Sequence, residues 1–170
     1  MDADTQRSKS LRRARLALAI FTVCLVAAGL TAIPVEWELD VLARWLGLPQ
    51  DADAANHAGL AHWIAKVRAG VRDTNARYPF IAYGFDWLAF AHVVLAILFV
   101  GAIIDPARNF WVITFGMIAC ILVIPWSFVF GHVRGIPFSW QLIDCAFGVV
   151  GIIPLWLARR FAVQLGALGD

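Results

Sequence analysis

The chain has 170 residues, of which 61% are hydrophobic and only 15% are charged, and its mean hydropathy is +0.74. A soluble domain is about 45–50% apolar and about 25% charged, so this composition is typical of a membrane protein. The formal net charge is only +2 and no basic stripe is interleaved with aromatic residues, which argues against a nucleic-acid partner.

Four apolar runs are long enough to cross a bilayer, which takes about 20 mostly apolar residues in a helix. These runs cover residues 16–35, 81–104, 110–130 and 140–158. Short links join the last three runs, so we expect an antiparallel three-helix unit over residues 81–158. The predicted fold is an all-α membrane protein with four transmembrane helices.

The first run follows a basic stretch over residues 1–15, which contains five Lys and Arg residues. A cleaved signal peptide would have the same pattern, with Ala27-Ala28-Gly29 as a cleavage site, but its apolar part is usually only 7–15 residues long. We therefore favour a retained helix. An excess of basic residues also marks the cytoplasmic side, so we expect both termini, including a tail over 159–170, to be cytoplasmic.

Residues 36–80 are predicted to form an extracytoplasmic amphipathic helical insert between the first two transmembrane helices. Apolar residues at helical spacing from Val35 to Leu46 predict one helix, which ends at Gly47. A second helix is expected after Asp51 or Asp53. Its expected apolar face is Leu60, Ile64, Val67 and Val71, and its expected wet residues are Lys66, Arg68, Arg72 and Asp73. Such helices lie on the bilayer or cover the bundle.

Two carboxylates, Asp86 and Asp144, lie inside apolar runs, where charged side chains are costly. Alternating helix directions place both at roughly 6–8 Å below the same membrane surface. Arg134, Gln141 and His132 belong to the same mouth of the bundle. We interpret this set as a binding site for a small ligand, a cation or a proton. The alternative is that either carboxylate pairs with Arg134 and fixes the adjoining hairpin.

Small residues form a face on each of the last three apolar helices, which favours close packing. In the fourth run the face consists of Gln141, Asp144, Gly148, Gly151 and Leu155, and in the third it consists of Gly116, Cys120, Ser127 and Gly131. Such faces also suit contacts with other membrane proteins or with a second copy of the chain. The alternative function is therefore an accessory or assembly subunit of a membrane complex.

His92 lies near the middle of the second apolar run, about 16 Å deep. It shares a face with Ala89, Ala96 and Phe99, so we expect a buried neutral histidine that is hydrogen-bonded to a neighbour. A third functional hypothesis is a single-histidine haem or quinone redox protein. His132 lies too near the rim to act as a second ligand to the same iron.

Signatures of other chemistry are absent. The sequence has no HExxH, GxSxG or Walker-type motif. Cys24, Cys120 and Cys145 lie in apolar runs without metal-ligand spacing, and His57 and His62 do not share a helix face. No metal site is predicted, and neither a cofactor nor an enzymatic reaction is assigned.

The stretch from Tyr78 to Arg160 resembles a family of uncharacterised bacterial four-helix membrane proteins. The resembling segments are residues 83–92 (YGFDWLAFAH), 105–109 (DPARN), 134–137 (RGIP) and 140–145 (WQLIDC). The resemblance covers about half of the chain and implies a multi-pass protein of the bacterial inner membrane. No activity is attached to that family.

Overall fold

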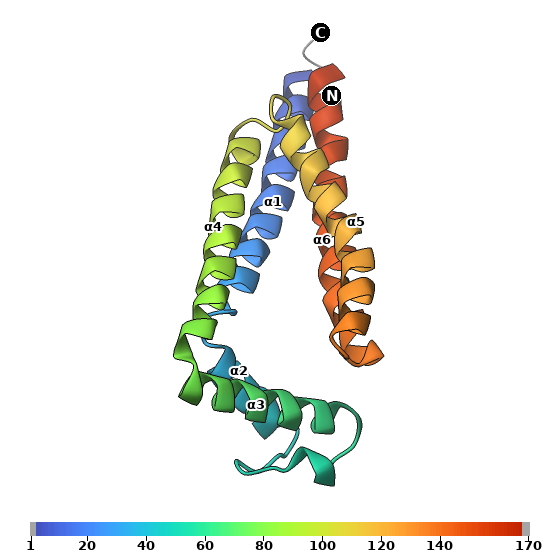
Figure 1. Cartoon of the computed structure of the whole chain (residues 1–170). Helices are drawn as coiled ribbons and strands as arrows, with labels where there is room; N and C mark the ends of the chain where they lie inside the picture. Colours follow the sequence, from blue (N-terminus) through green and yellow to red (C-terminus); the bar gives the residue numbers. More distant parts are fainter. Residues whose placement is uncertain (1–2, 168–170) are drawn as a thin grey trace. The chain divides into compact units, whose positions relative to one another are not determined.

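The computed structural model describes residues 3–167, and these residues form six α-helices and two short 3-10 helices without any strand. The α-helices are α1 (Ala3–Leu30), α2 (Val35–Trp45), α3 (Gly59–Arg77), α4 (Tyr83–Ile104), α5 (Phe110–Val133) and α6 (Phe138–Ala167) (Figure 1). The 3-10 helices are η1 (Ala54–Asn56) and η2 (Pro79–Ala82). The chain divides into unit 1 (Met1–Leu25 and Val94–Asp170) and unit 2 (Val26–Val93), so α1 and α4 contribute to both.

Four helical segments are long and apolar enough to cross a membrane: Asp4–Leu30, Pro79–Ile104, Phe110–Val133 and Phe138–Gly166. They correspond to the four predicted apolar runs. Large apolar side chains remain exposed along them, Ile97, Ile121 and Val150 among them, as expected for helices whose outer surface meets lipid. The predicted fold class, all-α with four helices able to span a membrane, is confirmed.

The helix ends differ from the predicted limits. Helix α1 begins at Ala3, inside the basic stretch, and ends at Leu30 instead of Val35. Pro34 fits this early end, because it has no N–H to donate to the carbonyl of Leu30, four residues before it. Helix α6 continues through the predicted tail to Ala167, and its residues Ala162 and Leu165 are buried. The burial of these two residues stabilises the extra turns of α6, and hydropathy along the sequence does not predict such packing.

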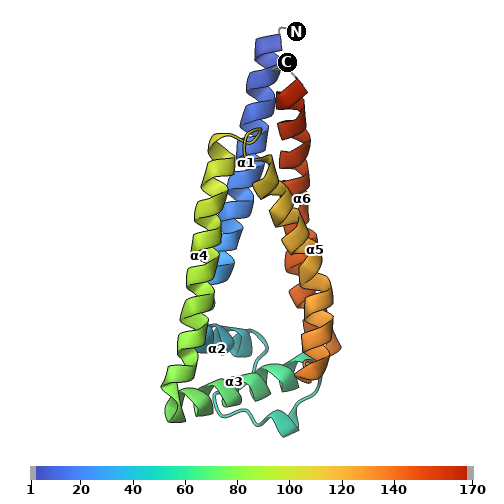
Figure 2. The same cartoon turned by 45° about the horizontal axis from the view of Figure 1, so that its top comes forward.

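Helices α5 and α6 form an antiparallel hairpin in unit 1 (Figure 2), and small residues let them approach closely. A Cβ atom on Gly148 would lie 2.3 Å from the carbonyl oxygen of Cys120, and one on Gly116 would lie 2.7 Å from the Phe99 ring. Leu18, Phe99, Ile113 and Leu155 complete the core around this contact. The predicted small-residue faces of these two helices therefore face each other and the core of unit 1.

Polar side chains fix the link between α4 and α5. The amide of Asn109 donates to the carbonyls of Gly101 and Asp105, both at 3.0 Å. Arg15 of α1 donates from Nε to Ile103 O at 3.0 Å and from Nη2 to Ile104 O at 2.7 Å. The last carbonyls of a helix have no partner inside that helix, so Asn109 and Arg15 supply partners for three of the last four carbonyls of α4, those of Gly101, Ile103 and Ile104.

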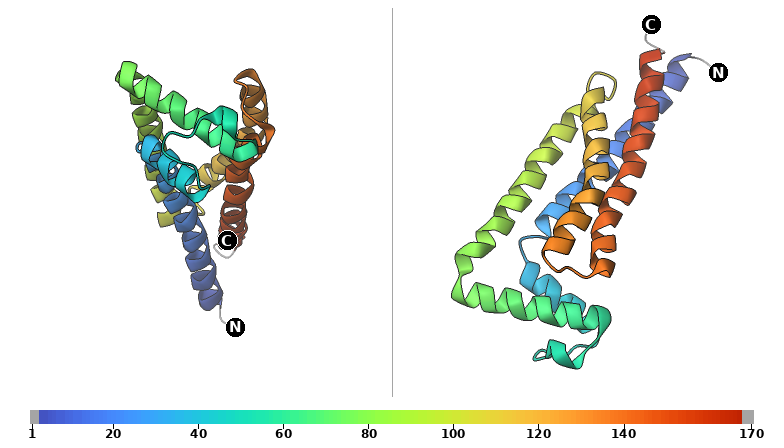
Figure 3. Two further views of the ribbon diagram at one scale, coloured as in Figure 1. Left: turned by 90° about the horizontal axis from the view of Figure 1, so that it is seen from below. Right: turned by 45° about the vertical axis from the view of Figure 1, so that its right-hand side comes forward.

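In unit 2, α2 packs against α3 (Figure 3), and the contact is built around a buried arginine. Arg68 is 5% exposed. It donates to Asp40 Oδ1 at 2.7 Å and to Pro49 O at 3.0 Å, and Arg72 donates to the same carboxylate oxygen at 2.7 Å. The prediction that Arg68 stays in water was wrong, because the carboxylate on α2 pairs with its charge and allows its burial.

The start of α3 also differs from the prediction. Asp53 accepts a hydrogen bond from Ala55 N at 2.9 Å and so caps η1. Helix α3 begins later, at Gly59, and has no side-chain cap. The buried apolar residues of α3 are Ile64 and Ala65, whereas Leu60 is exposed. The predicted helix exists, but its buried face is rotated toward Ala65 and Arg68.

The pKa of Asp40 reflects two opposing effects. Burial favours the neutral acid and would raise the pKa, but the hydrogen bonds and charges of Arg68 and Arg72 outweigh burial and hold the pKa below its usual value. The stability from this ionised carboxylate is therefore present above the ordinary aspartate pKa. It is lost only as the pH falls through the lowered value.

We expect Gly148→Ala to destabilise the protein by about 1–3 kcal/mol, the usual cost of overpacking a tight contact. Gly166→Ala, on the same helix but with open space around its position, should stay within about 1 kcal/mol of the wild type. Thermal unfolding in mild detergent measures both. Equal melting temperatures would contradict the close approach of α5 and α6.

We expect Arg68→Ala to destabilise the α2–α3 contact by about 2–3 kcal/mol, because charged hydrogen bonds are lost. The control is Arg77→Ala, which removes only an exposed pair with Asp73 and should change stability by about 0–1 kcal/mol. Hydrogen exchange of α2 and α3 provides the measurement. Similar exchange rates in the two variants would rule out the buried role of Arg68.

Candidate ligand site on helices α5 and α6

Asp144 is half-buried on α6 and makes no hydrogen bond or ion pair with any residue that the structure describes. It lies six residues from the start of α6, at a depth of roughly 9 Å along the helix. The ion pairs formed between residues 3 and 167 all lie in unit 2. The structure therefore shows no pair between Asp144 and Arg134, whereas the alternative pair of Asp86 with Arg134 joins residues of different units and stays a prediction.

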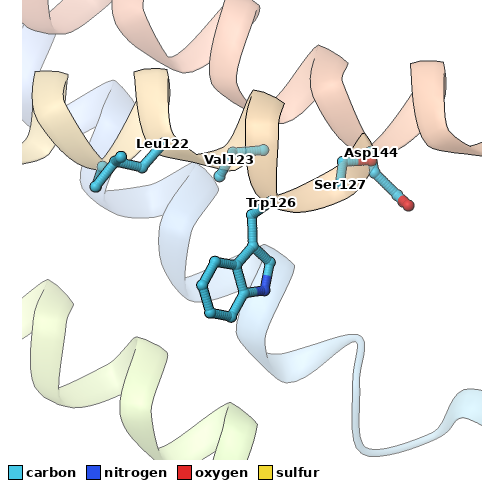
Figure 4. A pocket seen from close by; sticks show the side chains of 6 residues that line it. Leu122, Val123, Trp126, Ser127 and Asp144 are labelled. Carbon is cyan, nitrogen blue, oxygen red and sulfur yellow. The ribbon is translucent and has the colours of Figure 1, made fainter. Parts of the chain in front are cut away.

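Asp144 lines an open groove of about 480 Å³ whose other walls come from α5. The wall residues are Ala119, Leu122, Val123, Trp126 and Ser127. The side chains of Asp144 and Trp126 extend from the two helices toward the same side (Figure 4). Trp126 is 68% exposed and its ring lies 4.5 Å from that of Phe130, centroid to centroid. The groove thus combines one carboxylate with an aromatic ring and aliphatic walls.

Gln141 sets the register that creates this groove. Its side-chain Nε2 donates to Ile136 O at 2.7 Å, and its backbone carbonyl accepts from Ser127 Oγ at 3.0 Å. Its side chain also packs against Gly131, where a Cβ would lie 2.5 Å away. These contacts hold the first turn of α6 against the last turns of α5. As a result, Asp144, one turn further along α6, comes opposite Trp126 and Ser127.

Of the five residues predicted to bind a ligand, only Asp144 lines the groove. Gln141 is buried and occupied by structural hydrogen bonds, while His132 and Arg134 are exposed near the α5–α6 link. Asp86 belongs to unit 2, where it is exposed in the first turn of α4. Within unit 1, the predicted polar mouth does not form one site.

Sequence reasoning missed Trp126 and Ser127 as site residues. The sequence pattern placed Ser127 on a packing face only. Their depth carried the missing signal: Trp126 lies seven residues before the end of α5 and Asp144 six residues after the start of α6. On antiparallel neighbours joined by a short link, equal distances from the link mean equal depth.

His92 is half-buried in unit 2 and packs against α1, since a Cβ on Gly29 would lie 2.3 Å from His92 Cβ. Its Nδ1 lies 2.8 Å from the carbonyl oxygen of Leu88. A carbonyl can only accept, so Nδ1 carries the proton in this hydrogen bond. His92 is thus hydrogen-bonded, but it is half-buried instead of buried, and its partner belongs to its own helix.

No protein-family model, curated protein or solved structure matches this chain. The resemblance of residues 78–160 to a bacterial membrane family therefore stays a prediction.

We expect Asp144→Asn to raise the stability of the folded protein by about 1 kcal/mol, because it removes an unpaired charge from apolar surroundings. Gln141→Met, of similar shape, should lower stability by about 1–3 kcal/mol, because the Ile136 carbonyl loses its partner. Melting temperatures in the same detergent test both. Equal destabilisation by the two changes would mean that Asp144 supports the fold as Gln141 does.

Proposed function

We propose that this chain is a multi-pass membrane protein that binds a small lipophilic organic cation in the Asp144 groove. The observation that carries the proposal is the unpaired carboxylate in an apolar groove on a helix long enough to span a membrane. Charged side chains at such positions face protein or bound partners, and they usually have a function. A ligand cation would supply the countercharge that no described side chain provides.

The groove walls favour an organic cation over a metal ion. Trp126 presents an exposed indole ring beside the carboxylate, and indole is the strongest aromatic partner for an organic cation. Leu122, Val123 and Ala119 suit the hydrocarbon part of such a molecule. A calcium ion takes six to eight oxygen ligands, whereas this groove offers one carboxylate and one hydroxyl. Its volume falls within the usual range of about 300–1,000 Å³ for ligand sites.

The membrane setting belongs to the same proposal. The N-terminal part of α1 is built into unit 1, with Ala14 and Leu18 fully buried, which supports a retained helix over a cleaved signal. Basic residues gather at the start of α1 and near the end of α6. The preference of such residues for the cytoplasmic side supports two cytoplasmic termini, and with the bacterial resemblance it supports the inner membrane.

The other two functional hypotheses receive less support. Gly148 and Gly151 contact Cys120 inside unit 1, so the glycine face no longer argues for an accessory subunit with a partner at that surface. The single-histidine haem or quinone hypothesis is supported by His92 alone, whose Nδ1 is hydrogen-bonded to Leu88 O and whose Nε2 is the one remaining ring nitrogen.

We expect the purified protein to bind tetraphenylphosphonium, a lipophilic cation, and Asp144→Asn to weaken binding at least about tenfold by removing the countercharge. Trp126→Leu should weaken binding about fivefold through the lost ring contact. Equilibrium dialysis in mild detergent measures the dissociation constants.

The control is Trp111→Leu, because Trp111 is on the same helix and is equally exposed, at 69% against 68%. It should leave binding unchanged. Asp86→Asn distinguishes the groove from the broader site predicted from the sequence, because only a site that includes Asp86 would lose affinity through this change. Wild-type affinity in Asp144→Asn would refute the proposed function.

A further inference from the structure

A second groove lies at the other end of unit 1, where α1 begins, α4 ends, α5 begins and α6 ends. This end carries eight basic side chains against two acidic ones among the described residues. The basic residues are Arg7, Lys9, Arg12, Arg13, Arg15, Arg108, Arg159 and Arg160, and the acidic residues are Asp4 and Asp105. The hydrogen bond from Ser10 Oγ to Gln164 Oε1, at 3.2 Å, joins α1 to α6 here.

Aromatic rings hold three of these arginines along the helix ends. The guanidinium of Arg159 lies 4.9 Å from the Phe110 ring, that of Arg160 lies 4.8 Å from the Trp156 ring, and that of Arg13 lies 5.8 Å from the Phe161 ring. Aromatic and basic residues together are typical of the level at which lipid headgroups meet a transmembrane helix. This end of unit 1 therefore has the side chains of a headgroup region.

The groove itself measures about 530 Å³ and has both polar and apolar walls. Its donors are Arg7, Ser8 and Arg15, its carboxylates are Asp4 and Asp105, and its apolar residues are Leu11, Ile104, Ala107 and Leu165. Arg15 and Asp105 are occupied, because Arg15 binds the end of α4 and Asp105 Oδ1 accepts from Arg108 N at 3.0 Å.

Arg7 and Ser8 are the donors that remain for a ligand. Both are exposed, and neither makes a hydrogen bond or ion pair with residues 3–167. A guanidinium fork with an adjacent hydroxyl suits the oxygens of a phosphate group. The repulsion from Asp4 is offset by the surplus of basic side chains at this end.

We propose that this groove binds the phosphate of an anionic phospholipid, with Arg7 and Ser8 on the headgroup and Leu11, Ile104 and Leu165 against the first part of an acyl chain. Basic pockets between transmembrane helices are a known form of anionic lipid site. The apolar wall favours a lipid over free phosphate, which would leave that wall in water. The proposal concerns a different groove from the Asp144 site and does not depend on it.

The test is native mass spectrometry of the full chain in mild detergent, titrated with phosphatidylglycerol or phosphatidylcholine of matched acyl chains. The wild type should retain phosphatidylglycerol and not phosphatidylcholine. Arg7→Gln should weaken phosphatidylglycerol retention about tenfold, the effect of one charged hydrogen bond. Arg12→Gln is the matched control, because it removes the same charge from an exposed position of the same helix outside the groove.

Four results would overturn the proposal: no lipid retained by the wild type, equal retention of both lipids, equal weakening by Arg7→Gln and Arg12→Gln, or displacement of the lipid by inorganic phosphate at equal concentration. Equal weakening would show attraction by net charge alone, and displacement would show a free-phosphate site. Circular dichroism checks the fold of each variant. Ser8→Ala serves as a second groove variant that changes no charge, and it should also weaken retention.

Discussion

The close contact between the backbones of α5 and α6 is the constraint on which unit 1 depends. Gly148 lies directly against the carbonyl of Cys120, and no larger residue fits there without moving one of the helices. Apolar side chains alone fix helix position weakly in lipid, because lipid tails are as apolar as leucine. The small residues, together with the Ser127–Gln141 hydrogen bond, therefore set both the distance and the register of the hairpin. That register places Asp144 beside Trp126.

Two polar residues one turn apart on α6, Gln141 and Asp144, differ in whether the fold satisfies their polar groups. Gln141 is buried, and its side chain and backbone both have hydrogen-bond partners. Asp144 follows on the same face and has none among the described residues. A polar group that is satisfied inside a fold contributes to its stability, and an unsatisfied charge opposes it. Asp144 contributes no stabilising interaction to the fold. A ligand that binds its carboxylate would provide the missing interaction.

Hydropathy and spacing predicted the helical fold, the four long apolar helices and the small-residue faces, because each follows from local pattern. These patterns did not predict burial that depends on a pairing partner far away in the sequence. By its residue type, Arg68 is expected to be exposed to solvent. It is buried because its Nε lies 2.7 Å from Oδ1 of Asp40, which is 28 positions away in the sequence. The candidate site was only partly predictable: depth places Asp144 level with Trp126 and also near Arg134 and His132, and helix rotation decides which of these residues line the groove. Depth can be counted along a sequence, but rotation depends on which residues of a neighbour fill the contact.

The ligands that we propose for the two grooves of unit 1 have opposite charges, and the surroundings of each groove explain why the proposed sites use different numbers of charged groups. Asp144 lies within an apolar helix, where the low dielectric makes one ion pair strong and an unpaired charge costly. One carboxylate is therefore enough to define that site. Arg7 lies beyond the apolar part of α1, where water and salt screen its charge. A site there needs several nearby cations and an apolar wall to distinguish a lipid from other anions. The second groove has such a wall, and it lies at the end of unit 1 that carries the eight basic side chains. The number of charged groups that a site requires thus follows from its distance from water.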